Sequence, residues 1–589
     1  MEARPFGNSE GIGGNYLTYE QDAPLGYTGA SSVLPTELQQ SDHFVPVEDR
    51  WRLGFSAWDR YGKGHPAQDD YPYKEGSLLD PYNLNVFKGD FPVIGQHTFY
   101  SVTATNLSIH EFRQTPTATT PFESTRDAFS AGFFGDPDQL FYAPFFKFEF
   151  DLFHGNEAFK PLDWKVRLTP IFNVNYLEVD ELAVVNPDVR RGTTRTRQDF
   201  SLEEWYAEVK LADIGPDYDF VSARIGSQLF VSDFRGFLFR DTNRAVRLFG
   251  TRLANRDQFN LIWFDQAEKN TNSELNTFDD RHQNVVIANY FRQDFVFPGY
   301  TAQASFHYNN DQPSTQFDDN DNLVRPDPVG VFKEHQIDAY YVGVAGEGHM
   351  GRINVVNQLY FAFGNDSANP IGGTKQQIEA QMAALELSYD RDWIRFRASY
   401  FYASGDSDPN DGRGEGFDTI FDDPIFAGGE FSYWQRQSIR LFGTNLVQRK
   451  SIVPNLRSSK TQGQSNFVNP GLHLFNFGMD FEVTPKLKVI SNANYLTFDE
   501  TNVLEVYTFQ DKINREIGTD LSIGCEYRPL LNDNVIFVMG IATLIPDEGL
   551  KDLFGSQLPD ELQEIGVGDE LADVTPKLTS AFCELVLTY

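Results

Sequence analysis

Apolar and polar residues alternate with a period of two along most of this chain. Between residues 162 and 177, for example, Trp164 and Val166 share one face, and Lys165 and Arg167 share the other. The same period recurs in three further windows, 145–153, 201–211 and 472–483. Because an α-helix repeats every 3.6 residues, these windows predict β-strands with one apolar and one polar face.

Extended along the chain, the pattern predicts about 18 strands. They are expected at 97–112, 140–154, 162–179, 199–212, 217–231, 242–252, 257–268, 283–297, 300–311, 335–348, 352–365, 375–389, 392–404, 471–483, 486–499, 515–528, 533–545 and 575–589. Short turns and long connections alternate between them, and the longest connection is 405–470. An even strand number with this asymmetry is typical of an all-β, transmembrane, antiparallel up-and-down β-barrel.

The last strand supports this interpretation. Its outward residues end with Cys583, Leu585 and Leu587, and the chain stops on the aromatic Tyr589. If the first strand starts at the periplasmic face, every short turn lies on the periplasmic side and every long connection on the external side. Tyr589 then lies at the periplasmic face. Phe582 shares the inward face, although a water-filled channel does not require a ring there. We therefore expect something to pack against this strand from inside.

The two cysteines are predicted to remain free thiols. Cys525 and Cys583 both fall on apolar, lipid-facing positions, and the strand 533–545 lies between their strands. Two strand spacings amount to about 10 Å, whereas a disulfide needs Cα atoms within about 7 Å.

Residues 1–96 form a separate, irregular N-terminal extension, and the barrel occupies 97–589. The extension is rich in Gly, Pro, Asp and Tyr and contains one strand-like run, at 51–58. It either folds into the lumen as a plug or lies at the periplasmic mouth. A disordered leader fits only 1–45 well. Residues 1–20 lack the basic and apolar regions of a signal peptide.

The amino-acid composition narrows the range of possible functions. The net charge is −35, and such acidity argues against nucleic acid as a partner, because phosphate binding needs clustered Lys and Arg. Aromatic residues reach 15% although the mean hydropathy is −0.42. A barrel reconciles the two, since its rings face lipid while its lumen and loops stay polar. No apolar run is long enough for a transmembrane helix.

Charged residues on the predicted inner face are the candidate pore-lining groups. They are Lys165, Arg167, Arg224, Arg395, Arg397 and Lys488, together with Glu149, Asp151, Glu204, Glu208, Asp480, Glu482 and Glu526. Basic rows facing acidic rows would set a transverse field that tunes ion selectivity. Alternatively, the charges pair across strands and stiffen the wall. The two roles are compatible.

The connection after residue 404 contains a candidate calcium loop. Asp406, Asp408 and Asn410 have the 1, 3, 5 spacing of an EF-hand loop. Position 6 is Asp411 instead of glycine, and position 12 is Phe417. A solvated acidic turn is the alternative, and no other cofactor is expected.

Two motifs resemble the alginate-export family of outer-membrane porins. One is Ala403-Ser-Gly-Asp406 at a strand end, followed by an Asp/Asn/Gly run and Phe417-Asp-x-x-Phe421. The other is Ala223-Arg-Ile-Gly-Ser-Gln228. The resemblance covers about 200–265 and 390–430. It implies an 18-stranded barrel that passes polar or anionic solutes, although a wall of mixed sign disfavours alginate itself.

Enzyme motifs lack their structural context. The GxSxG match at 7–11 lies in a Gly-rich tail, and the GxGxxG match at 346–351 falls at a hairpin with no following helix. We therefore expect a non-enzymatic porin in the outer membrane of a diderm bacterium, narrowed by the N-terminal segment and inward loops. Its partners would be membrane lipid and small polar or charged solutes, which cross passively. A plugged structural or anchoring barrel is the alternative, and a homo-oligomer or an envelope assembly stays open.

Overall fold

The computed structural model describes residues 78–82, 85–95, 97–116, 137–155, 161–186, 188–215, 217–437, 451–555 and 577–589. The chain divides into two compact units. One comprises Met1–Val102 with Leu152–His154, and the other comprises Thr103–Asp151 with Gly155–Tyr589. No helix within the described ranges is both long and apolar enough to cross a membrane.

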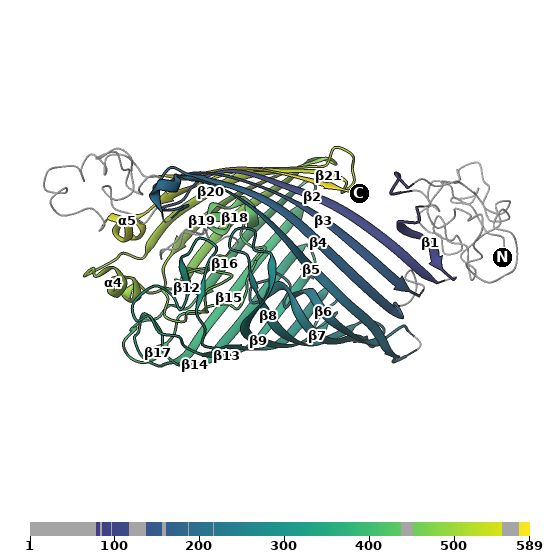
Figure 1. Cartoon of the computed structure of the whole chain (residues 1–589), viewed down its shortest axis with the longest axis horizontal. Coiled ribbons are helices and arrows are strands. Elements are labelled where there is room, and N and C mark those ends of the chain that lie inside the picture. The colour runs from purple at the N-terminus through teal and green to yellow at the C-terminus, as the bar shows by residue number, and fades with distance from the viewer. Residues whose placement is uncertain are drawn as a thin grey trace, which may run out of the picture. The chain divides into compact units, whose positions relative to one another are not determined.

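The larger unit is a closed β-barrel (Figure 1). The main sheet of the described residues has 20 strands, and 18 remain without the short β1 (Lys88–Ile94) and β17 (Arg413–Gly414). The 18 strands are β2 (Thr98–Gln114), β3 (Asp138–His154), β4 (Trp164–Val179), β5 (Thr194–Asp213), β6 (Phe220–Val231), β7 (Arg240–Arg252), β8 (Asp257–Lys269), β9 (Asn276–Arg292), β10 (Tyr300–Asp311), β13 (Ile337–Met350), β14 (Ile353–Asp366), β15 (Gln376–Arg391), β16 (Ile394–Ala403), β18 (Leu472–Thr484), β19 (Leu487–Thr497), β20 (Glu516–Tyr527), β21 (Val535–Pro546) and β22 (Leu578–Thr588). Closure comes from β22, which pairs antiparallel with β2 from Thr105↔Thr588 to Arg113↔Ser580. The predicted fold class is therefore confirmed.

The remaining described elements lie in the connections. They are the two-stranded β11 (Gln316–Phe317) and β12 (Leu323–Arg325), and the helices η3 (Val189–Arg191), η4 (Gly429–Phe431), α3 (Tyr433–Gln437), α4 (Asn502–Thr508) and α5 (Glu548–Gly555). Turns such as 351–352, 392–393 and 485–486 lie at one end of the barrel, which we call the short-turn end. The long connections lie at the other, the long-connection end.

Strand boundaries differ most from prediction at β9. The expected strand was 283–297, but β9 ends at Arg292, and residues 293–299 form the turn. Asp294 and Val296 have positive φ there (52° and 70°), so the run cannot continue as a strand. Phe295 and Val296 are apolar and therefore imitate a strand in the sequence. β5 begins earlier than expected, at Thr194, because residues 194–198 carry no apolar face to announce it.

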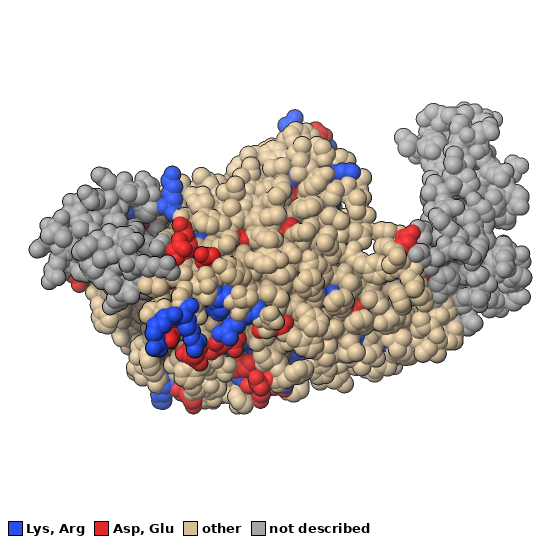
Figure 2. All heavy atoms as spheres, turned by 45° about the horizontal axis from the view of Figure 1, so that its top comes forward, with Lys and Arg blue, Asp and Glu red and all other residues tan. Residues whose placement is uncertain are grey.

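The barrel exterior is apolar. Alternate strand residues such as Val166, Leu261, Ile523 and Ile541 are exposed large hydrophobic side chains. Figure 2 shows a mainly uncharged surface, with charged groups gathered toward the long-connection end. An apolar belt around a closed sheet is the exterior of a transmembrane barrel. Within this unit, Cys525 and Cys583 are both free thiols, as predicted.

The long-connection half of the interior is packed solid. Two stretches of the β16–β18 connection, residues 405–437 and 451–470, fold inward, and we call them the inner plug. Inward wall residues such as Phe401, Leu474 and Leu544 join buried plug residues such as Phe417 and Trp434 in one apolar cluster. Predicted inward loops are thus present, and the described part of the longest connection occupies the long-connection half of the barrel.

A hollow in the barrel wall seats the plug. Gly524 and Gly540 are register partners on β20 and β21, and Phe582 on β22 pairs with Gly540. A Cβ on Gly524 would lie 2.2 Å from Phe431 Cδ1, so only glycine leaves room for this ring. Phe431 packs against Phe582 with 5.8 Å between ring centroids, and the Arg436 guanidinium lies 3.6 Å above the Phe582 ring. The predicted inside partner of Phe582 is therefore the inner plug.

In the smaller unit, β1 runs antiparallel to the first residues of β2, with Lys88 opposite Ser101. Phe99 stacks on Phe153 at 5.6 Å between centroids, and Thr98 shares a 2.9 Å hydrogen bond with the His154 ring. Residues 1–77, including the strand-like run 51–58, lie outside the described residues. The place of the extension, in the lumen or at the mouth, stays a prediction.

Candidate functional site: the charged inner wall

The short-turn half of the barrel has a charged inner wall. On β3 to β5, Arg167 forms a bidentate pair with Asp151, with Nε–Oδ1 and Nη2–Oδ2 distances of 2.7 and 2.6 Å. Arg167 also lies 3.4 Å from a Glu204 oxygen, and Lys165 lies 3.2 Å from Asp151. Strand alternation turns these side chains inward, because their neighbours Val166 and Leu168 are exposed on the outer face.

A second group continues along β5 to β7. Arg224 binds Glu208 through Nε and Nη2 at 2.9 and 2.6 Å and lies 4.3 Å above the Tyr206 ring. Arg247 packs 4.3 Å above the Phe249 ring and donates to the Asn260 side chain. Within the described chain Arg247 has no carboxylate partner at ion-pair distance. Its positive charge is therefore the least compensated on this wall.

A third group lies on β15 to β19. Arg397 approaches Asp480 at 3.4 Å and Glu386 at 4.0 Å, and Lys488 lies 3.9 Å from Asp480 and 4.0 Å from Glu482. Gly478 faces Arg397 across the strands, and a Cβ there would lie 2.5 Å from Arg397 Nη2. Glycine at this position lets the guanidinium lie flat against the wall.

The remaining predicted residues form ion pairs of their own. Arg395 pairs with Asp390, Glu526 with Arg528, and Glu149 with Lys147. Every predicted inner-wall charge thus has an ion-pair partner; most of these pairs join neighbouring strands, whereas Glu526 pairs with Arg528 two residues along the chain. Most of these side chains are part-exposed, for example Arg167 at 21% and Arg224 at 19%. Their role in lining a conducting pore stays a prediction.

The sequence pattern did not predict Arg235, which the fold brings to the charged inner wall. It lies in an inward turn after β6, held by Asp233, whose carboxylate accepts backbone N–H bonds from residues 235–238. Arg235 Nη2 reaches Glu347 at 3.1 Å and Glu386 at 4.0 Å, on β13 and β15. The contact joins positions 112 residues apart, so no local pattern announces it. Arg247, by contrast, fits the period-two pattern and could have been found.

Buried ion pairs hold the inner plug. Arg457 Nε lies 2.6 Å from Asp418 Oδ2, and both side chains are at most 1% exposed. Lys460 pairs with Asp422. Arg436 binds Glu111 at 2.8 Å and Glu584 at 2.7 Å, on β2 and β22. Arg457 and Lys460 therefore tie the two stretches of the plug together, whereas the Arg436 pairs tie the plug to the barrel wall.

The calcium prediction at Asp406, Asp408 and Asn410 is not tested by this structure. Asp406 accepts from the backbone N–H of Asp408 at 3.0 Å, and Asp408 accepts from that of Asn410 at 3.0 Å. Within the described ranges, no group of three or more His, Cys, Asp or Glu side chains is placed to hold a metal ion. Burial raises the pKa of the Asp406 carboxyl to about 7.

The raised pKa predicts a pH response in this loop. Because the folded pKa exceeds the unfolded one, the fold favours protonated Asp406. The loop should therefore be most stable below about pH 4 and lose stability as pH rises through about 7. Amide hydrogen exchange of residues 405–416, corrected for intrinsic rates, would measure this. Asp406→Asn should flatten the profile, and an unchanged slope in that variant would assign it to another group.

Comparison with known proteins finds distant matches among solved structures. No family model and no curated protein matches the chain. Among solved structures, Pseudomonas aeruginosa OccK9 (OpdG) is 9% identical with a TM-score of 0.44, covering 83% of this chain and 98% of that chain. The P. aeruginosa outer membrane protein OpdK is 11% identical with a TM-score of 0.42, covering 83% and 99%. Acinetobacter baumannii OccAB4 is 10% identical with a TM-score of 0.41, covering 84% and 99%.

Proposed function

We propose that this chain is a porin of the outer membrane of a diderm bacterium, through which small polar or charged solutes diffuse passively. The charged, part-exposed inner wall carries the proposal. A barrel serving only as an anchor needs an apolar exterior but no lumenal rows of Arg, Lys, Asp and Glu. Resemblance to the alginate-export family supports the same class, and transport of a polyuronate is not part of the proposal.

The wall and the plug have different roles in the proposed transport. On the short-turn side, Arg167, Arg224 and Arg247 follow one arc of the wall, while Asp480 and Glu482 lie on another. A solute crossing this field exchanges its water for contacts with part-exposed charges, so the balance of charge sets which ions pass. Arg235 lies where the solute meets the packed half.

Arg247 offers the sharpest test of this function. Because it has no carboxylate partner among the described residues, Arg247→Gln removes one positive charge without leaving an acid unpaired. In planar bilayers under a KCl gradient, the wild type should conduct. The variant should conduct with its reversal potential moved toward that of potassium. Arg190→Gln, in an exposed loop, is the charge-matched control and should behave as wild type.

Two results would count against the proposal. One is a purified, folded barrel that never conducts, even after deletion of residues 1–77. The other is an Arg247→Gln reversal potential equal to that of wild type, which would remove this wall from the conducting path.

A structural or anchoring barrel is the second candidate, and the solid packing around the inner plug favours it. Fixed partners that co-purify with a non-conducting barrel would support this role. Calcium in the 405–416 loop would suit either function, as a brace for the connection at the barrel mouth.

A further inference from the structure

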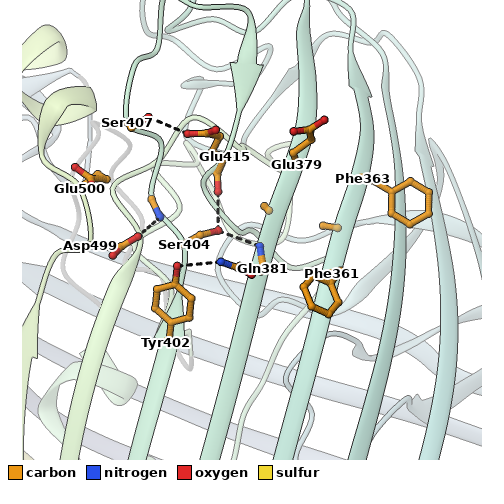
Figure 3. A pocket seen from close by; sticks show the side chains of 13 residues that line it. Phe361, Phe363, Glu379, Gln381, Tyr402, Ser404, Ser407, Glu415, Asp499 and Glu500 are labelled. Carbon is orange, nitrogen blue, oxygen red and sulfur yellow. Dashed lines mark hydrogen bonds between the residues drawn. The ribbon is translucent and has the colours of Figure 1, made fainter.

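The first stretch of the inner plug is fastened where it leaves β16 (Figure 3). The Ser404 hydroxyl donates to the Glu415 carbonyl at 2.6 Å and accepts from the Gln381 backbone N–H on β15 at 3.0 Å. A hydroxyl, a carbonyl and a backbone N–H carry no charge, so this contact does not change with pH near neutrality.

The second stretch of the plug, residues 451–470, is held by ionisable groups at the long-connection end. Gln464 Nε2 donates to Asp311 Oδ1 at 3.0 Å and to the His335 carbonyl at 3.2 Å. The backbone N–H of Ser458 donates to Asp327 Oδ1 at 3.2 Å. These acceptors belong to the end of β10 and to the connection between β12 and β13, so both hold the plug from outside it.

Three buried carboxylates face the His335 ring. Its Nδ1 lies 2.7 Å from Asp366 Oδ1, and both side chains are only 2% exposed. Burial lowers the pKa of His335, but the hydrogen bond to Asp366 and the charges of Asp366, Asp327 and Asp311 outweigh it, so the pKa is raised. Within the described ranges, no Lys or Arg lies at ion-pair distance from these three carboxylates. His335 Nε2 and Asp311 Oδ2 are also buried without a hydrogen-bond partner there.

The arginines that face this cluster are engaged by other groups. Arg325 pairs with Glu268, and Arg457 pairs with Asp418. Arg281 donates to backbone carbonyls of the plug. Because buried charges are stable only when they are balanced, a protonated His335 is the cation that the three carboxylates lack.

We propose that His335 is a pH-sensitive latch for the inner plug. When the ring is protonated, its charge balances the three carboxylates, which then hold residues 451–470 at the long-connection end. When the ring releases its second proton to solvent, the carboxylates are left unbalanced, and this stretch of the plug loosens. The latch requires the plug but not conduction, and only its effect on conductance rests on the proposed function.

The latch should weaken as pH rises. Because the pKa of His335 in the folded chain lies above its unfolded value of about 6.5, the stabilisation is fully present below that pH and is lost as pH rises through the raised pKa. Asp327 acts in the same direction at lower pH, because burial raises its pKa to about 6. The contribution of His335 is therefore measured above pH 6.5.

Amide hydrogen exchange of residues 451–470 between pH 6.5 and 8.5, corrected for intrinsic rates, tests the latch. In wild type the corrected protection should fall severalfold over this range. His335→Gln should abolish the fall and give, at pH 6.5, the protection that wild type has at pH 8.5. Asp366→Asn keeps the ring but removes its closest acid, so the fall should be smaller than in wild type. His282→Gln is the matched control with a wild-type slope, because His282 also contacts an acid, Asp280 at 3.2 Å, but both are exposed.

Two outcomes would overturn the latch. Constant protection in the wild type would show that the cluster does not titrate in this range. A wild-type fall that persists in both His335→Gln and Asp366→Asn would assign the response to another group. Heat-modified mobility on gels checks that each variant is folded.

Planar-bilayer recording separates the latch from the proposed function. Conductance should rise with pH in wild type and should not depend on pH in His335→Gln. If exchange follows the expected profile while no conductance appears, the latch stands and the porin proposal fails.

Discussion

Arg457→Ala is expected to loosen the inner plug, because Arg457 ties its two stretches together, and to raise single-channel conductance severalfold. The Arg457 guanidinium binds Asp418, the Ile420 and Lys460 carbonyls and the Ser465 hydroxyl, all inside the barrel. Removing it leaves Asp418, which is fully buried, without its closest cation. Breaking one side of a buried pair costs about 3–5 kcal/mol, which the plug's other contacts must absorb. Planar-bilayer recording measures the conductance.

The control separates loss of the pair from loss of an arginine. Arg190→Ala removes an exposed guanidinium from another connection and should leave conductance unchanged. In the double variant Arg457→Met/Asp418→Asn, no charge remains unpaired at this contact, so conductance should return toward wild type. Wild-type conductance in Arg457→Ala itself would mean that the plug is held by other contacts or that the conducting path does not pass it.

The wall of the barrel could be predicted from sequence because its physics is local. Each strand must be apolar toward lipid. The period-two pattern alone therefore predicts that Val166 and Leu168 on β4 face the lipid. The inner-wall charges follow from the same alternation, and Lys165 and Arg167 lie inward as expected. Their partners were less accessible, because strand register decides which acid meets which base. The predicted strand 283–297 failed where Phe295 and Val296 supplied apolar residues to a turn.

The inner plug could not be predicted from any local pattern. Residues 405–470 lack a period, and their composition of Gly, Asp and Asn looks like that of an external loop. What turns this connection inward are contacts far apart in sequence, such as Arg436 with Glu111, separated by 325 residues. The residue that gave the best indication of the plug was Phe582, because an inward aromatic ring is not expected to face water. It indicated a partner but did not identify it.

Gly540→Val is the second substitution with a large expected effect, because it fills the hollow that seats the plug. A Cβ on Gly540 would lie 2.6 Å from Phe582 Cε1 and 3.1 Å from Phe431 Cδ1. The first distance requires the Phe582 ring to move and the second crowds Phe431, and the two further methyl groups of valine add to this crowding, so we expect Phe431 to be displaced together with η4 and α3. Overpacking of this kind costs about 1–3 kcal/mol. We expect a lower unfolding temperature and a higher conductance than in wild type.

Phe431→Ala distinguishes a displaced plug from a distorted wall. It removes the same contact without crowding the wall, so its conductance should also rise. Gly215→Ala is the matched control, because nothing lies within 4 Å of a Cβ there and the position does not require positive φ. If Gly540→Val raises conductance and Phe431→Ala does not, the wall is what changed. If both rise together while Gly215→Ala stays at wild type, the ring in the glycine hollow is what keeps the plug in place.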